Sequence, residues 1–254
     1  MGVSRFLAAT ALAAMALASV PTLALAQSVP AQSAPIAKAD QPYFDLYDSI
    51  IGGLDLDQMA NQGADAIFDG MARNNAEFAA LAKSQPGLKG EFRSVAKPYL
   101  SIWVGRTFSM KRGRVAAKFK EHLNPAEARE LAAFYGSPLG RKMLRAVGNN
   151  LSASNTVDSA LKGRSGKVDQ NAVRDDEADT VSAAMQDLIP NLTPAEQRQM
   201  LALGKTSAFR KLDGVAEAMQ SVPDPAFNEI ATQEEQKAFA EALGALFRKA
   251  RARQ

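Results

Sequence analysis

The chain has 254 residues, of which 46% are hydrophobic and 22% charged, and its formal net charge is +3. It contains no cysteine, which excludes disulfides, thiol nucleophiles and iron–sulfur clusters. The weak charge gives no indication of nucleic-acid binding, and a chain of this length can form a large core without covalent crosslinks.

Residues 1–26 have the pattern of a secretory signal peptide: Arg5, then an uncharged run that ends in the small residues Ala24-Leu25-Ala26. An uncleaved membrane anchor is the alternative interpretation, because the run is nearly long enough to span a bilayer. We expect cleavage before Gln27, a periplasmic location and no transmembrane segment in the mature chain. Residues 27–40 are rich in Gln, Ser, Pro and Ala and predict a disordered linker.

Residues 41–104 predict a group of N-terminal helices, because their apolar residues recur at helical spacing. The stripes are Tyr43, Tyr47, Ile50 and Leu54, then Met59, Gly63, Ile67 and Met71, then Leu88, Phe92, Val95, Tyr99 and Ile102. Gly52-Gly53 is expected to end the first helix, and Asp55 or Asp57 to cap the second. Pro98 lies inside the third stripe, so we expect a kink or a break near Lys97.

One segment of the chain occurs twice. Leu123-Asn124-Pro125-Ala126-Glu127-Ala128-Arg129 returns as Leu192-Thr193-Pro194-Ala195-Glu196-Gln197-Arg198, an offset of 194 − 125 = 69 residues. Each copy predicts a helix followed by a second helix, that is, a helical hairpin. We assign residues 105–165 to the first repeat and 174–254 to a diverged second repeat. No segment alternates with a period of two, so the expected fold is all-α, built from internally duplicated hairpins.

The start of each copy has the residues of a helix N-terminus. Asn124 and Thr193 are suited to accept hydrogen bonds from first-turn amides, a proline follows each, and a glutamate stands three positions after each cap. Gly136 and Gly204 fit the left-handed position that follows many helices. Thr232 and Glu235 repeat the pattern faintly and open the last predicted helix.

The segment between the copies is polar, and residues 152–172 predict a loop. The acidic run that follows consists of Asp175, Asp176, Glu177 and Asp179. Its order does not fit a calcium-binding loop, which also needs a central glycine. We expect these carboxylates to charge the first turn of the helix that they begin.

Candidate catalytic residues are few. His122 is the one histidine, and a lone histidine cannot form a zinc site without other converging ligands. Ser137 stands in Gly136-Ser137-Pro138-Leu139-Gly140, which is not a nucleophile elbow because the serine comes one position early. It is better suited to cap a helix. We therefore predict no cofactor and no metal, and a hydrolase using His122 remains an alternative.

A basic patch is the main electrostatic feature. It contains Arg106, Lys111, Arg112, Arg114, Lys118 and Lys120, with Trp103 and Phe108 beside them. Such a patch could contact anionic lipid, a cell-wall polymer or an envelope protein; the alternative is a solvated helix face. We predict a contact surface made of Phe134, Tyr135, Arg112, Arg114 and Lys118.

The segment Leu131-Ala132-Ala133-Phe134-Tyr135-Gly136-Ser137-Pro138-Leu139-Gly140-Arg141-Lys142 resembles the signature of a bacterial family called domain of unknown function 2059. The resemblance covers about residues 105–150. In the second copy, Leu203-Gly204 replaces Phe-Tyr and Ser207-Ala208-Phe209 replaces the Ser-Pro segment. The resemblance implies an exported helical protein and brings no activity, substrate or catalytic residue.

Three functions are compatible with these observations. The first is a non-enzymatic interaction or structural module of the bacterial envelope. The second is a carrier that holds an apolar ligand between helices, which a cavity lined by large apolar side chains would favour. The third is the hydrolase, which a cleft joining His122 to Ser137 would favour.

Overall fold

The computed structural model describes residues 37–162, 169–212, 214–216, 222 and 227–253, and these residues form helices and loops without a strand. The predicted signal peptide and most of the predicted linker lie outside the described residues. The elements are α2 (Gln41–Ile51), α3 (Leu56–Asn74), α4 (Ala76–Ser84), α5 (Leu88–His122), α6 (Pro125–Gly136), α7 (Pro138–Asn149), α8 (Ser154–Lys162), α9 (Gln170–Leu188), η1 (Ile189–Asn191), α10 (Pro194–Leu203), α11 (Ser207–Arg210), α13 (Phe227–Ile230) and α14 (Gln233–Arg251). The all-α prediction is confirmed.

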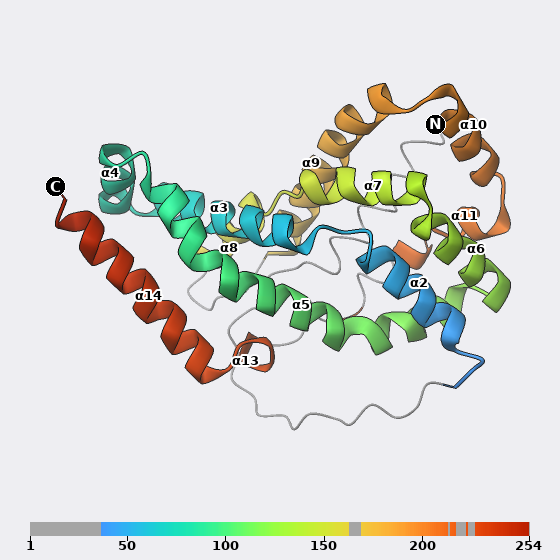
Figure 1. Ribbon diagram of the computed structural model, residues 1–254, viewed down its shortest axis with the longest axis horizontal. Helices are drawn as coiled ribbons and strands as arrows, with labels where there is room; N and C mark the ends of the chain where they lie inside the picture. Colours follow the sequence, from blue (N-terminus) through green and yellow to red (C-terminus); the bar gives the residue numbers. More distant parts are fainter. Residues whose placement is uncertain (1–36, 163–168, 213, 217–221, 223–226, 254) are drawn as a thin grey trace.

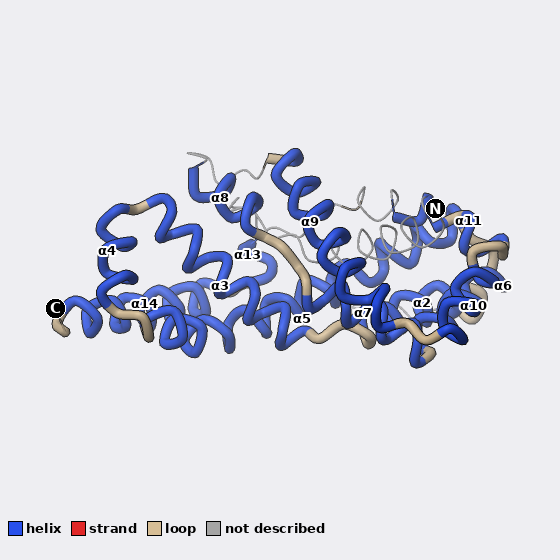
Figure 2. The backbone as a smooth tube through the Cα atoms, turned by 90° about the horizontal axis from the view of Figure 1, so that it is seen from above, coloured by secondary structure: helices blue, strands red, loops and turns tan. Residues whose placement is uncertain are grey.

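The long helix α5 runs along the molecule and connects its two ends (Figures 1 and 2). Helices α3 and α14 pack on α5, and α2 packs between α5 and α6. One core cluster joins α2, α6, α7, α9 and α11 to the C-terminal half of α5, and a second joins α3, α4 and α14 to its N-terminal half. The predicted boundary between residues 104 and 105 falls inside α5, so the N-terminal helices and the first repeat share one helix.

Helix α5 continues through Pro98, so of the predicted kink or break near Lys97 the break does not occur. Proline removes one backbone hydrogen bond and strains the preceding turn, which is unfavourable in an isolated helix. Here the two sides of the proline are held by tertiary packing, because Phe92 and Ala96 before it are fully buried and Trp103 after it is 7% exposed. Packing therefore outweighs the local penalty.

Three helices begin with a complete capping box, in which the cap side chain accepts from the amide of the third helical residue and the glutamate there accepts from the cap amide. The pairs are Asn124 and Glu127 at α6, Thr193 and Glu196 at α10, and Thr232 and Glu235 at α14. The predicted helix starts are thus confirmed, including the faint third one. The predicted left-handed conformation is wrong at both glycines, since Gly204 has φ −58° and ψ −12° and Gly136 is the last residue of α6 itself.

The two copies of the repeat contact each other through two reciprocal ion pairs. Lys211 in the second copy binds Glu127 in the first at 2.7 Å, and Lys142 in the first binds Glu196 in the second at 3.1 Å. Glu127 and Glu196 are 69 residues apart, and so are Lys142 and Lys211, so both ion pairs join the same two positions of the repeat. Reciprocal contacts of this kind are also found between two-fold related units, although the second helix of the hairpin has 12 residues in the first copy (α7) and 4 in the second (α11).

Equivalent positions of the two copies also share one core. Leu131 and Met200 are 0% and 5% exposed, and Met143 and Leu212 are 0% and 5% exposed. All four belong to the same cluster. The shared apolar stripe of the repeat therefore faces the interior in both copies, as its spacing predicts.

Acid is expected to destabilise this arrangement. Hydrogen bonds from Lys211, Ser207 and the Asn124 amide lower the pKa of Glu127 from 4.5 to about 2, and Arg106 together with the Thr232 amide lowers the pKa of Glu235 to about 2. A carboxylate with a lowered pKa in the folded state contributes stability that is complete above its unfolded pKa and is lost as the pH falls through its folded pKa.

Urea unfolding should therefore show a free energy of unfolding that falls between about pH 4.5 and pH 2, the interval between these pKa values. Glu127→Gln removes one titrating group. The free energy of unfolding of this variant should therefore fall less steeply over this pH interval than that of the wild type. Lys211→Met removes the cation of the Lys211–Glu127 ion pair, and its free energy of unfolding should also depend less steeply on pH. Identical curves for the three proteins would contradict this assignment.

Candidate functional site

A pocket lies between α3, α5, α8 and α9, with a volume of about 120 Å³. Most of its lining is apolar. The residues that line it are Met59, Ala60, Gln62, Gly63, Ile67, Leu100, Val104, Leu151, Ser152, Ala153, Thr156, Val157, Val173, Asp176 and Glu177. Pockets between the helices of a bundle are a common place for small ligands, and apolar walls with few polar groups are typical of such sites.

One wall comes from α3 and α5. Met59, Gly63 and Ile67 are spaced by four residues on α3, and Leu100 and Val104 by four on α5. Residues four apart lie on the same face of a helix. Part of the predicted α3 stripe therefore faces this pocket, while Met59 also belongs to the main core cluster.

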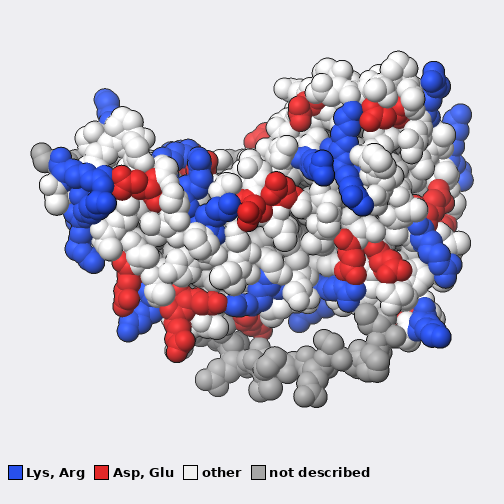
Figure 3. All heavy atoms as spheres, in the orientation of Figure 1, with Lys and Arg blue, Asp and Glu red and all other residues white. Residues whose placement is uncertain are grey.

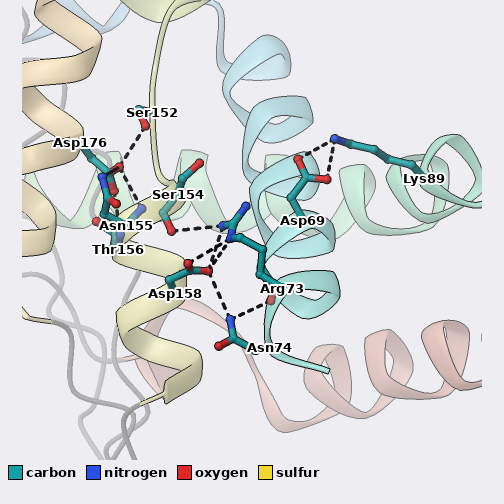
Figure 4. A network of polar contacts seen from close by, with 11 residues as sticks. Asp69, Arg73, Asn74, Lys89, Ser152, Ser154, Asn155, Thr156, Asp158 and Asp176 are labelled. Atoms are coloured by element: carbon teal, nitrogen blue, oxygen red, sulfur yellow. Dashed lines mark hydrogen bonds and ion pairs between the residues drawn. The ribbon is translucent and has the colours of Figure 1, made fainter. Parts of the chain in front are cut away.

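The opposite wall is formed by α8 and α9, and α8 was missed in the sequence, which predicted a loop over residues 152–172. Asp176 on α9 accepts four hydrogen bonds from the start of α8 (Figure 4). The donors are the Ser152 hydroxyl at 2.9 Å, the Asn155 amide and side chain at 3.0 and 3.1 Å, and the Thr156 amide at 2.8 Å. The Asp176 carboxylate thus satisfies the exposed amides at the N-terminus of α8.

A second polar contact fastens α8 to α3. Arg73 on α3 donates to both carboxylate oxygens of Asp158 on α8, at 2.9 to 3.1 Å, and Asn74 donates to one of them at 3.3 Å (Figure 4). A two-pronged arginine–carboxylate contact fixes direction as well as distance. Asp176 and Asp158 therefore hold α8 from two sides, and α8 contributes Thr156 and Val157 to the pocket wall.

The charged groups at the pocket are acidic. Asp176 is 3% exposed and Glu177 is 7% exposed, and no basic residue is among the lining residues that the structure describes. The acidic run was predicted to charge the first turn of its own helix, but α9 begins at Gln170, ahead of the run. Asp176 instead stabilises the first turn of a different helix.

The predicted contact surface is only partly at the surface. Phe134 and Tyr135 are 4% and 1% exposed and belong to the main core cluster. The Phe134 ring packs edge to face on Phe209, with 5.1 Å between the ring centres. The structure therefore places both aromatic residues in the core, where Phe134 contacts the second copy through Phe209.

The basic residues of that predicted surface lie on α5, and two of the three form ion pairs within the chain. Arg112 binds Asp48 at 2.5 Å and lies 4.7 Å from the centre of the Phe44 ring, and Lys118 binds Glu121 at 2.9 Å. Arg114 is exposed. Acidic and basic side chains alternate on the face of the molecule in Figure 3, which shows no broad area of one sign among the described residues.

His122 and Ser137 have separate local roles. His122 is the exposed last residue of α5 and lies beside Gly214. The Ser137 hydroxyl accepts from the Gly140 amide at 3.1 Å and so caps α7, as predicted. Among the residues that the structure describes, His122 forms no hydrogen bond to a serine or a carboxylate, so no catalytic triad is assembled around it.

The described part of the chain contains no candidate metal site and no candidate membrane span. No three His, Asp or Glu side chains there converge in a way that could hold a metal ion. None of the helices within those ranges is both long enough and apolar enough to cross a bilayer.

Comparison with known families finds a match to part of the chain. Residues 112–156 match the model of DUF2059, described as an uncharacterized protein conserved in bacteria, which confirms the resemblance of the Phe134-Tyr135 segment to that family. The matched residues extend from the C-terminal half of α5 through α6 and α7 to the first turn of α8. No curated protein and no solved structure matches the chain.

Proposed function

We propose that this protein is a non-enzymatic binding protein of the bacterial envelope that holds a small apolar ligand between α3, α5, α8 and α9. The pocket between these helices is the observation that carries the proposal. An engineered apolar cavity of about 150 Å³ binds benzene, so a pocket of about 120 Å³ has room for a group of similar size. The ligand is therefore a single small ring or the end of an alkyl chain.

The position of the predicted site residues favours ligand binding over the other two functions. An interaction surface centred on Phe134 and Tyr135 would need these rings at the surface, where they are not. A hydrolase would need a nucleophile beside His122, whereas the Ser137 hydroxyl is engaged as a helix cap. Ligand binding in the apolar pocket is compatible both with the buried rings of Phe134 and Tyr135 and with the capping role of Ser137.

The envelope location is supported by the sequence of residues 1–26, with its positive start, uncharged run and small-residue ending. The match to a family conserved in bacteria is compatible with it. Export would also bring the pocket close to the envelope membranes, whose lipid chains are apolar.

Toluene binding tests the proposal on the mature chain, residues 27–254. Toluene at about ten times its Kd should raise the free energy of unfolding by about 1.4 kcal/mol and Tm by about 3–6 °C. Methyl NMR should show the largest shifts at Ile67, Leu100, Val104 and Val157, which line the pocket.

Two matched variants locate the site. Val104→Phe places a larger side chain at the pocket wall and should reduce the stabilisation by toluene. Val181→Phe makes the same change at a partly buried position outside the pocket and should leave that stabilisation intact. Absence of any saturable effect of toluene on the wild type, or equal effects in both variants, would refute ligand binding at this pocket.

A further inference from the structure

Gly63 is a helical glycine in the pocket wall. It lies in the interior of α3, between Met59 and Ile67 on the stripe that faces the pocket. A Cβ atom placed on Gly63 would meet a single neighbour, the Leu100 Cδ1 atom, at 3.9 Å. That distance is an ordinary van der Waals contact, so packing does not require glycine here.

Two other glycines have a steric reason, whereas Gly90, Gly105 and Gly113 lie within α5 and a Cβ atom on any of them would have no neighbour within 4 Å. A Cβ on Gly53 would collide with the side chain of Leu144, and a Cβ on Gly140 would lie 2.7 Å from the Tyr135 Cα atom. Glycine in the interior of a helix is less favourable than alanine because of its backbone freedom. Gly63 also fills no tight space and makes no turn, but it differs from the three glycines of α5 because it lines the pocket, so the space beside it is pocket volume.

We propose that Gly63 determines the size of the ligand, and that the ligand presents an uncharged hydrocarbon group about as large as benzene. This inference rests on the proposed function. A side chain at position 63 would occupy the space beside Leu100 that the ligand fills. Uncharged chemistry follows from the lining, which is mostly apolar and whose described charged members, Asp176 and Glu177, are acidic. An anionic ligand would be desolvated next to two carboxylates, which is unfavourable.

The test compares toluene with benzoate on the mature wild type and on three variants. Gly63→Ala should weaken toluene binding about fourfold, the effect of losing roughly one methylene of burial. Gly63→Leu should weaken it by at least about tenfold, because its side chain adds several carbon atoms. Benzoate should bind the wild type at least about tenfold more weakly than toluene.

Stability measurements separate loss of the pocket from loss of the fold. Gly63→Ala should raise Tm by about 2–4 °C, because alanine is the better helix former. Gly113→Ala, the third variant, is the matched control, since Gly113 lies in the interior of α5 and a Cβ atom added to it would have no neighbour within 4 Å. It should raise Tm similarly and leave toluene affinity unchanged.

The outcomes distinguish this inference from the proposed function. If the wild type binds no toluene, the proposed function fails. If the wild type binds toluene and the folded Gly63→Leu variant binds it equally well, the role of Gly63 is refuted while ligand binding stands. If benzoate binds as tightly as toluene, the assignment of an uncharged ligand is refuted.

Discussion

Gly140→Ala is expected to lower the free energy of unfolding by about 3 kcal/mol, the upper end of the usual cost of overpacking. A Cβ atom at this position would collide with the carbonyl oxygen of Phe134, and would lie 2.7 Å from the Tyr135 Cα atom and 2.8 Å from the Phe134 carbonyl carbon. These are backbone atoms, which cannot move aside as the tip of a side chain can. The clash can be relieved only by shifting α6 against α7.

The shift would be felt in the core because both helices bury their apolar faces there. Leu139 and Met143 on α7 are 3% and 0% exposed, and Leu131 on α6 is 0% exposed. Urea unfolding followed by circular dichroism measures the effect. Gly136→Ala is the matched control at the same corner, because no atom lies within 4 Å of its Cβ position; its stability should change by less than about 0.5 kcal/mol. Equal effects of the two substitutions would contradict the steric explanation.

This corner gives a physical meaning to the segment that resembles the family signature. Ser137 caps α7, Pro138 occupies the first helical position and needs no amide partner there, and Gly140 allows the turn of α7 to approach α6. The three residues together make a tight helical corner. The role of this segment is therefore explained by the packing of the two helices.

Features that depend on neighbours in the sequence were predictable. The caps at Asn124, Thr193 and Thr232 are each set by residues within four positions, and so is the end of α2 at Gly52. The duplication was also visible, because 69 residues separate matching stripes. The ion pair between Glu127 and Lys211 could not be predicted from the sequence, since it depends on how the two copies pack.

The pocket and its α8 wall lay beyond this kind of reasoning for two reasons. Helix α8 is stabilised by Asp176, about twenty residues further along the chain, whereas its own sequence is polar and resembles a loop. The stripe that contains Met59 and Ile67 has the spacing of any buried face. Whether such a face meets another side chain or an open volume depends on the partner helix, and sequence spacing does not specify it.

Asp176→Ala is expected to lower the free energy of unfolding by about 3 kcal/mol and to release α8 from the pocket. Asp176 is 3% exposed, and its carboxylate accepts hydrogen bonds from Ser152, Asn155 and Thr156. Hydrogen bonds to a charged group contribute about 1.5–3 kcal/mol each, and water that reaches the freed donors recovers part of their sum. Hydrogen exchange should become faster at the amides of Asn155 and Thr156. Toluene should bind more weakly, because Thr156 and Val157 line the pocket.

Asp175→Ala provides the control for Asp176→Ala, since it removes the same charge one residue earlier from an exposed position. Its free energy of unfolding should change by less than about 0.5 kcal/mol, with hydrogen exchange in α8 and toluene affinity unchanged. If Asp176→Ala destabilised the chain without faster exchange in α8, the carboxylate would stabilise α9 or the core instead. If exchange became faster and toluene affinity did not change, α8 would not be a working wall of the pocket, and the ligand would contact α3 and α5 alone.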